Sequence, residues 1–209
     1  MKTKRKAVIL IMLLTALIIF SAGVALAQEE GENINGLNSE ETSETSDKNL
    51  EKEKEEQKTY VILGCALAIG IAGIASAIGL ALAGSSAVAV TAEKPDLFSK
   101  CLILQVLPMT QSVYGLLTAI LLMMGAGLLG GTADVSLLQG VGAIWIGLAV
   151  GLTGISAINQ GMVASSSISA VGRNPDVASK GIIFTVMPET IAIFGLLVGI
   201  LLMVGLELL

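Results

Sequence analysis

A repeat of two long, nearly charge-free apolar segments limits the fold of this 209-residue chain more than any other feature. The stretch 108–125 aligns with 188–205 at an offset of 80, and ten of these aligned positions are identical. Each copy holds two apolar runs, which gives four runs in all, at about 60–91, 98–125, 139–171 and 181–207. Each run is longer than the ~20 apolar residues that cross a bilayer as a helix. The repeat therefore predicts an all-α membrane protein made of two tandem helical hairpins.

The composition excludes several classes of protein. Hydrophobic residues make up 54% of the chain and charged residues only 14%, which is outside the range of soluble globular domains. Histidine is absent and no GxxxxGK[ST] loop occurs, so we expect no nucleophile–base chemistry and no ATP hydrolysis within this chain, which is not predicted to be an enzyme. The net charge of −5 comes from residues 28–58, which hold eleven Asp or Glu against four Lys. We therefore infer no nucleic-acid partner from the total charge.

The first 27 residues have the pattern of a secretory signal peptide. A basic start, Met1–Lys6, precedes an apolar run from Ala7 that ends in Ala25-Leu26-Ala27. The alternative is an uncleaved signal anchor, because an apolar run of about 20 residues can just span a bilayer. Both interpretations place the following residues outside the cell membrane.

The acidic segment 28–58 is rich in Glu, Ser, Thr and Asn and almost free of apolar side chains. Such a composition predicts a disordered external segment, although residues 50–56 could extend the next helix outward. The first transmembrane hairpin is predicted at 59–133 and the second at 134–209.

The positive charges predict the orientation. The loops inside the hairpins carry Lys94, Lys100, Arg173 and Lys180, whereas residues 126–140 contain no Lys or Arg. The positive-inside rule then places both hairpin loops in the cytoplasm and both mature termini outside.

Small residues line the first and third apolar runs, in part at a spacing of four (64, 68 and 72; 147 and 151), and they allow close helix packing. They suit either the inner layer of a narrow ring of subunits or ordinary packing within one monomer. The residues are Gly64, Ala68 and Ala72 in the first run, and Gly142, Gly147, Gly151 and Gly154 in the third.

Glu189 is the single charged residue between Lys180 and Glu207. A carboxylate at membrane depth costs several kcal/mol without a partner, and it therefore indicates a functional site. The alternative is a polar residue at a helix end that reaches the interface.

Oxygen-bearing side chains in the other runs match this carboxylate. Thr110, Gln111 and Tyr114 lie with Leu107 on one helical face at spacings of three and four, and Gln160 lies in the third run. The two copies have diverged in complementary ways: Met109 aligns with Glu189 and Leu80 with Gln160, while Gln111 and Tyr114 align with Ile191 and Phe194. Two hairpins are thus predicted to build one complete site.

The ligand set favours a hard monovalent cation. Hard cations prefer oxygen ligands, and this set offers a carboxylate, two amide oxygens and a hydroxyl. A proton site would need only the carboxylate and one hydrogen-bond partner. We therefore favour Na⁺, with H⁺ as the alternative.

These motifs resemble the proteolipid ring subunit, called K or c, of V-type and A/V-type rotary ATPases. The resemblance covers residues 59–209 and is carried by three motifs: Leu107-Pro108-x-Thr110-Gln111-x-x-Tyr114, Gln160, and Pro188-Glu189-Thr190. It implies Na⁺ ligation by the Leu107 carbonyl, Thr110, Gln111, Gln160 and Glu189, with Tyr114 bonded to the carboxylate. The Leu107 ligand rests on the resemblance alone.

The same resemblance implies a homo-oligomeric ring in the cell membrane, a stator membrane subunit and central-stalk subunits as partners. An independent cation-coupled antiporter and a purely structural proteolipid are the competing hypotheses. The first would need a substrate cavity, for which only Tyr114 and Trp145 supply aromatic side chains, and the second leaves the oxygen ligands unexplained.

Overall fold

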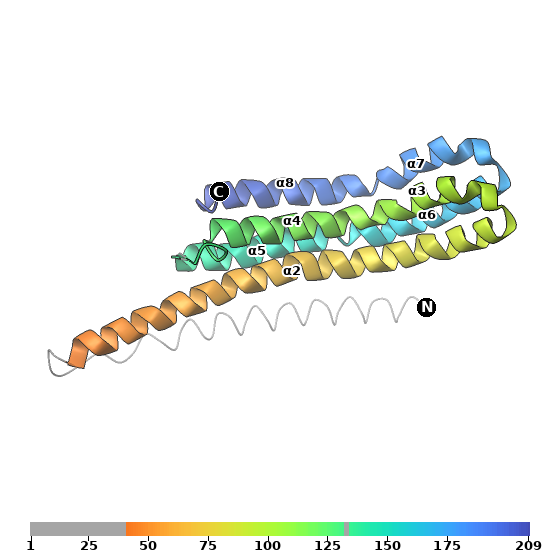
Figure 1. Cartoon of the computed structure of the whole chain (residues 1–209). Coiled ribbons are helices and arrows are strands. Elements are labelled where there is room, and N and C mark those ends of the chain that lie inside the picture. The colour runs from red at the N-terminus through yellow and green to blue at the C-terminus, as the bar shows by residue number, and fades with distance from the viewer. Residues whose placement is uncertain (1–40, 132–133) are drawn as a thin grey trace, which may run out of the picture. The chain divides into compact units, whose positions relative to one another are not determined.

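The computed structural model describes residues 41–131 and 134–209 and is helical almost throughout (Figure 1). The predicted signal peptide 1–27 and residues 28–40 of the acidic segment lie outside the described residues. Residues 47–209 form one structural unit.

Each of the two hairpins has one leg broken at a proline, and the other leg of the second hairpin is also interrupted, between α5 and α6. The first hairpin contains α2 (Glu41–Glu93), η1 (Pro95–Leu97), α3 (Phe98–Val106), η2 (Leu107–Met109) and α4 (Thr110–Gly125), where η marks a 3₁₀ turn. The second contains α5 (Leu137–Thr153), α6 (Ser156–Arg173), η3 (Pro175–Val177), α7 (Ala178–Val186) and α8 (Glu189–Gly205).

Four helical stretches among the described residues are long and apolar enough to cross a membrane, as the sequence predicts. They are Lys52–Glu93, Pro95–Gly125, Leu137–Arg173 and Pro175–Gly205. At 1.5 Å per residue each exceeds the ~30 Å of a bilayer's hydrocarbon core. The chain is therefore a multi-pass membrane protein whose helices extend past the hydrocarbon or tilt within it.

The start of α2 differs from the prediction of disorder for residues 28–58. The helix begins at Glu41, so residues 41–58 are helical. Residues 51–58 consist of Glu, Lys and Gln, which have high helix propensity, and an apolar helix that follows removes the cost of nucleation. Lys54 Nζ lies 3.2 Å from Asp134 Oδ1, which links this part of α2 to the segment before α5.

The prolines set the breaks in α3–α4 and α7–α8. Pro108 stands inside η2, and Pro188 is the residue directly before α8. Proline has no N–H for the helix ladder and its ring clashes with the preceding turn, so the helix stops and restarts there. Glu189 therefore begins a helix.

Glycines allow α2 to pack very closely against α5 and α6, as the spacing of small residues predicts. A Cβ on Gly147 would overlap the Gly64 carbonyl, and one on Gly161 would overlap Gly79. Two of the small residues contact other elements of the same chain: Ala68 faces Gly115 of α4, and Gly142 faces Leu206 after α8. Small residues in this chain therefore serve several helix pairs.

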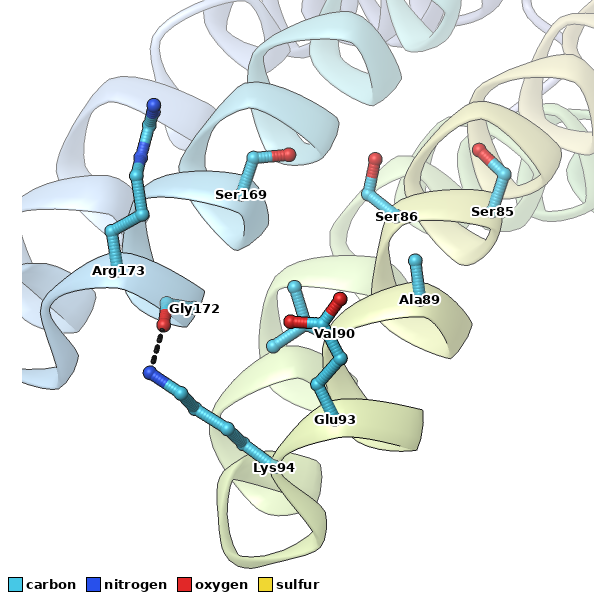
Figure 2. A pocket seen from close by; sticks show the side chains of 9 residues that line it. All are labelled: Ser85, Ser86, Ala89, Val90, Glu93, Lys94, Ser169, Gly172 and Arg173. Carbon is cyan, nitrogen blue, oxygen red and sulfur yellow. Dashed lines mark hydrogen bonds between the residues drawn. The ribbon is translucent and has the colours of Figure 1, made fainter.

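The two hairpin loops lie at the same end of the described unit (Figure 1). Lys94 Nζ donates to Gly172 O at 2.6 Å, and Lys100 Nζ donates to Pro175 O at 3.1 Å. Figure 2 shows the pocket beside the first of these bonds, between the ends of α2 and α6, with Glu93 and Arg173 among its lining side chains. The positive residues used to predict orientation thus gather at one end.

Candidate ion-binding site

Glu189 is buried within a single copy of the chain. It is the first residue of α8, and only 8% of its surface is exposed. The break at Pro188 places the carboxylate in the first turn of a helix, where the macrodipole favours negative charge. The carboxylate therefore lies inside the helix bundle with partial compensation from its own helix.

Both oxygens of the Glu189 carboxylate have a side-chain donor. The Tyr114 hydroxyl of α4 donates to Oε1 at 2.8 Å, and Gln160 Nε2 of α6 donates to Oε2 at 3.3 Å. Three helices thus hold one carboxylate. Donors on both oxygens offset the cost of burying the group and restrict its rotation.

The hydrogen-bond chain continues from Gln160 to the proline break of the first hairpin. Gln111 Nε2 donates to Gln160 Oε1 at 2.6 Å, and neither glutamine is exposed. The Thr110 hydroxyl lies 3.1 Å from Gln111 Oε1 and 3.0 Å from the Leu107 carbonyl oxygen. This one chain of contacts connects all six residues that the sequence indicates for the site.

The backbone breaks explain why these residues meet. Thr110 follows η2, so its backbone N–H and its hydroxyl both donate to the Leu107 carbonyl. α4 packs against α8, and η2 packs against α6. The face that carries Gln111 and Tyr114 is therefore turned toward Gln160 and Glu189.

The oxygens of the network retain capacity for a cation. An amide or backbone carbonyl oxygen has two lone pairs, and Gln160 Oε1 uses one of them to accept from Gln111. The Thr110 hydroxyl has one hydrogen and two nearby acceptors, so at most one acceptor is fully bonded at a time. The arrangement offers several oxygens around one negative charge, and oxygen ligands are those that hard cations prefer.

The second copy of the repeat keeps the local geometry of the proline break but not a site. Thr190 Oγ1 donates to Met187 O at 2.8 Å, as Thr110 does to Leu107, yet Thr190 is exposed. Met109, which aligns with Glu189, is 48% exposed. The chain therefore has one such cluster among its described residues.

Reasoning from the residues alone missed the Leu107 carbonyl, which came from the family resemblance. A signal for it is nonetheless present. A threonine two residues after a proline can donate its hydroxyl to the carbonyl three residues before it, and Thr110 and Thr190 both do so.

The family model of the ATP synthase C subunit matches residues 63–122 and 144–202 of the chain. Together these stretches cover more than half of the sequence, and one falls in each hairpin. The chain belongs to the ATP synthase C-subunit family. The first matched stretch of this family member contains Leu107, Thr110, Gln111 and Tyr114, and the second contains Gln160 and Glu189.

Several relatives are similar to more than two thirds of the chain. A-type ATP synthase subunit K of Methanocaldococcus jannaschii is 44% identical over 144 residues, which are 69% of this chain and 63% of that protein. V-type sodium ATPase subunit K of Enterococcus hirae is 38% identical over 147 residues, which are 70% of this chain and 91% of that protein. The 16 kDa proteolipid subunit of the V-type proton ATPase of Nephrops norvegicus is 30% identical over 144 residues, 68% and 89% of the two chains. The chain thus spans less than two thirds of the M. jannaschii relative.

Proposed function

We propose that this chain is a rotor subunit of an A/V-type ATPase that carries Na⁺ across the membrane on Glu189. The observation that carries the proposal is the hydrogen-bonded cluster around a single buried carboxylate, with donors from α4 and α6. Relatives named subunit K of an A-type ATP synthase and of a V-type sodium ATPase support the rotor role. Copies of the chain would form a ring, with the ion sites facing a stator membrane subunit.

The residues of the cluster favour Na⁺ over H⁺. Gln111 and Gln160 are fully buried polar side chains, and burying them in a membrane helix is costly unless their oxygens serve a purpose. A proton requires only the carboxylate and one partner, which Tyr114 supplies. Two glutamine oxygens, the Thr110 hydroxyl and the Leu107 carbonyl are in excess of that need.

The charge balance explains how the ion could travel. One Na⁺ bound to one carboxylate gives a neutral site, and a neutral site can face lipid at low cost. Loaded subunits would rotate through the lipid, and the site would exchange its ion where the stator offers water and an opposing charge. Central-stalk subunits would bind the end that carries the hairpin loops and would link rotation to ATP hydrolysis or synthesis elsewhere.

The topology follows from the same proposal. The end with Lys94, Lys100 and Arg173 would face the cytoplasm of a cell membrane, and both mature termini would lie outside. The proposed divisions are a signal peptide at 1–27, an external segment at 28–58, and hairpins at 59–133 and 134–209.

Carbodiimide labelling of the ring in detergent, with and without Na⁺ at fixed pH, tests the function. The reagent modifies protonated carboxyl groups, and mass spectrometry locates the modified residue. We expect labelling at Glu189 that Na⁺ prevents. Labelling at Glu189 that is unaffected by Na⁺ and falls as pH rises would establish H⁺ as the ion, and an unlabelled Glu189 would refute the site.

H⁺ is the second candidate for the transported ion. The Nephrops norvegicus relative is named as part of a proton ATPase, and the Tyr114–Glu189 bond alone provides the partner that a protonated carboxyl needs.

A further inference from the structure

The Ser156 hydroxyl is a buried polar group that no element of the described chain satisfies. Ser156 is 8% exposed, and its Oγ is the one buried side-chain nitrogen or oxygen without a hydrogen-bond partner among the described residues. An unsatisfied buried hydroxyl is strongly unfavourable, so native structures provide a partner, often an ordered water. Because the atom is buried within one copy, a neighbouring copy in a ring could not reach it without a rearrangement.

Ser156 stands where the helix backbone itself is interrupted. α5 ends at Thr153 and α6 begins at Ser156. Ile155 N–H donates to Leu152 O at 3.2 Å, and Ala157 N–H donates to Gly154 O at 3.0 Å. In a regular helix these donors would bond the carbonyls of Gly151 and Thr153. The break therefore leaves the carbonyls of Gly151 and Thr153, which precede Ser156 in the sequence, without their regular donors.

The break is adjacent to the ion site. Ser156 precedes Gln160 by four residues, so the two side chains lie on one face of α6, one turn apart. The neighbouring helix α8 runs antiparallel to this segment, since Gln160 bonds Glu189 and Thr153 faces Gly195. Ser156 lies between Thr153 and Gln160 in the sequence, so its counterpart on α8 lies between Gly195 and Glu189. This places Ser156 level with Ala192, in the first turn of α8 after Glu189.

The repeat shows what such a serine does when it has a partner. Ser76 aligns with Ser156, and its Oγ accepts the backbone N–H of Ser112 at 3.1 Å. Ser112 aligns with Ala192, but α8 begins one residue earlier in the repeat than α4 does. The corresponding N–H of Ala192 is then the fourth of its helix and can bond the carbonyl of Pro188. Ser156 thus keeps the hydroxyl of the repeat without its acceptor role.

We propose that Ser156 holds one buried water molecule on the α5 side of Glu189, and that this water belongs to the ion site. The water accepts from or donates to the Ser156 hydroxyl, donates to a carbonyl released by the break, and reaches the Gln160–Glu189 pair. These groups supply the two to four polar partners that a buried water needs. The part of the proposal that links the water to the ion rests on the function proposed above.

The competing explanation is a simple rotation of the side chain. Serines in helices often donate to the carbonyl four residues earlier, as Ser166 and Ser169 do here. For Ser156 this carbonyl is Leu152 O, which already accepts from Ile155 N–H. A water and a rotated hydroxyl differ in the position of Oγ and in the density beside it.

A cryo-electron microscopy map of the intact ring, at a resolution that shows ordered water, decides between them. We expect a water peak within hydrogen-bond distance of Ser156 Oγ in the wild type and its loss in Ser156→Ala. A site that lacks the peak in a map where other buried waters are resolved overturns the proposal, as does a hydroxyl bonded to Leu152 O. This result does not depend on which ion the ring carries.

The Na⁺ dependence of carbodiimide labelling at Glu189 tests the link to the ion. In Ser156→Ala we expect the Na⁺ concentration for half-protection to rise about three- to tenfold, as the loss of one hydrogen bond gives. Ser165→Ala is the matched control, because Ser165 lies on the same helix and bonds Ser86 instead. If the Na⁺ concentration for half-protection is unchanged in Ser156→Ala, the water does not contribute to ion binding and this part of the proposal is overturned. If Na⁺ does not protect Glu189 from labelling in the wild type, the Na⁺ function is refuted. The density beside Ser156 in the cryo-electron microscopy map still tests whether the water is present.

Discussion

On the proposed Na⁺ function, removing the Tyr114 hydroxyl should weaken Na⁺ binding without disturbing the fold. Tyr114→Phe deletes the donor that lies 2.8 Å from Glu189 Oε1 and leaves the Gln160 donor on Oε2. A hydrogen bond to a charged group contributes ~1.5–3 kcal/mol, and the lower value applies because Tyr114 is only half-buried. At ~1.4 kcal/mol per factor of ten, we expect the Na⁺ concentration for half-protection to rise about tenfold.

The measurement is a Na⁺ titration of carbodiimide labelling at Glu189 in the purified ring, at one pH. Tyr60→Phe is the matched control. Tyr60 of α2 is the other tyrosine of the chain, and it packs beside Gly140 of α5. Its midpoint should equal that of the wild type. A Tyr114→Phe ring with a wild-type midpoint would show that the hydroxyl does not orient the carboxylate, and the site geometry would have to be revised.

Three further predictions concern the carboxylate, the glutamine and the helix contact. Glu189→Gln should abolish labelling and ion transport while rings still form, as judged by native mass spectrometry; a variant that still transports ions would remove Glu189 from the mechanism. Gln160→Leu, which reproduces Leu80 of the first copy, should raise the Na⁺ midpoint by at least about tenfold, because it removes a carboxylate donor and the acceptor of a second glutamine. Gly147→Ala should lower the free energy of unfolding by about 1–3 kcal/mol or more, because the added Cβ overlaps α2, and the thermal unfolding temperature should fall. Gly70→Ala, which has open space at its Cβ, is the control and should change stability little. Equal stabilities of the two variants would contradict the close α2–α5 packing.

Much of the architecture could be predicted because the determinants are local. Apolar runs of sufficient length specify membrane helices, and prolines specify where α3 and α7 end. The 80-residue offset shows that the second hairpin copies the first. The contacting faces of α2 and α5 could be predicted from the small residues that follow Gly64 and Gly147 at a spacing of four, since such residues mark close helix contacts.

Other features depend on which helices become neighbours, and periodicity does not contain that information. Gly142 lies five residues before Gly147, which turns it away from the α2 contact, and it packs against Leu206. The composition of residues 41–58 predicts disorder, yet continuity with an apolar helix extends α2 to Glu41. The direct Gln111–Gln160 bond joins side chains 49 positions apart, and no local pattern reveals it.

The divergence of the two hairpins follows from the cost of burying charge. A second carboxylate at position 109 would require its own donors in the membrane, and the second hairpin has Ile191 and Phe194 where the first has Gln111 and Tyr114. Without those donors a charged group there would cost several kcal/mol, so a thioether at Met109 is the lower-energy choice. Conversely, Glu189 relies on Tyr114 and, through Gln160, on Gln111 of the first hairpin. The side chains around Glu189 therefore come from both hairpins, and neither hairpin alone supplies the whole cluster.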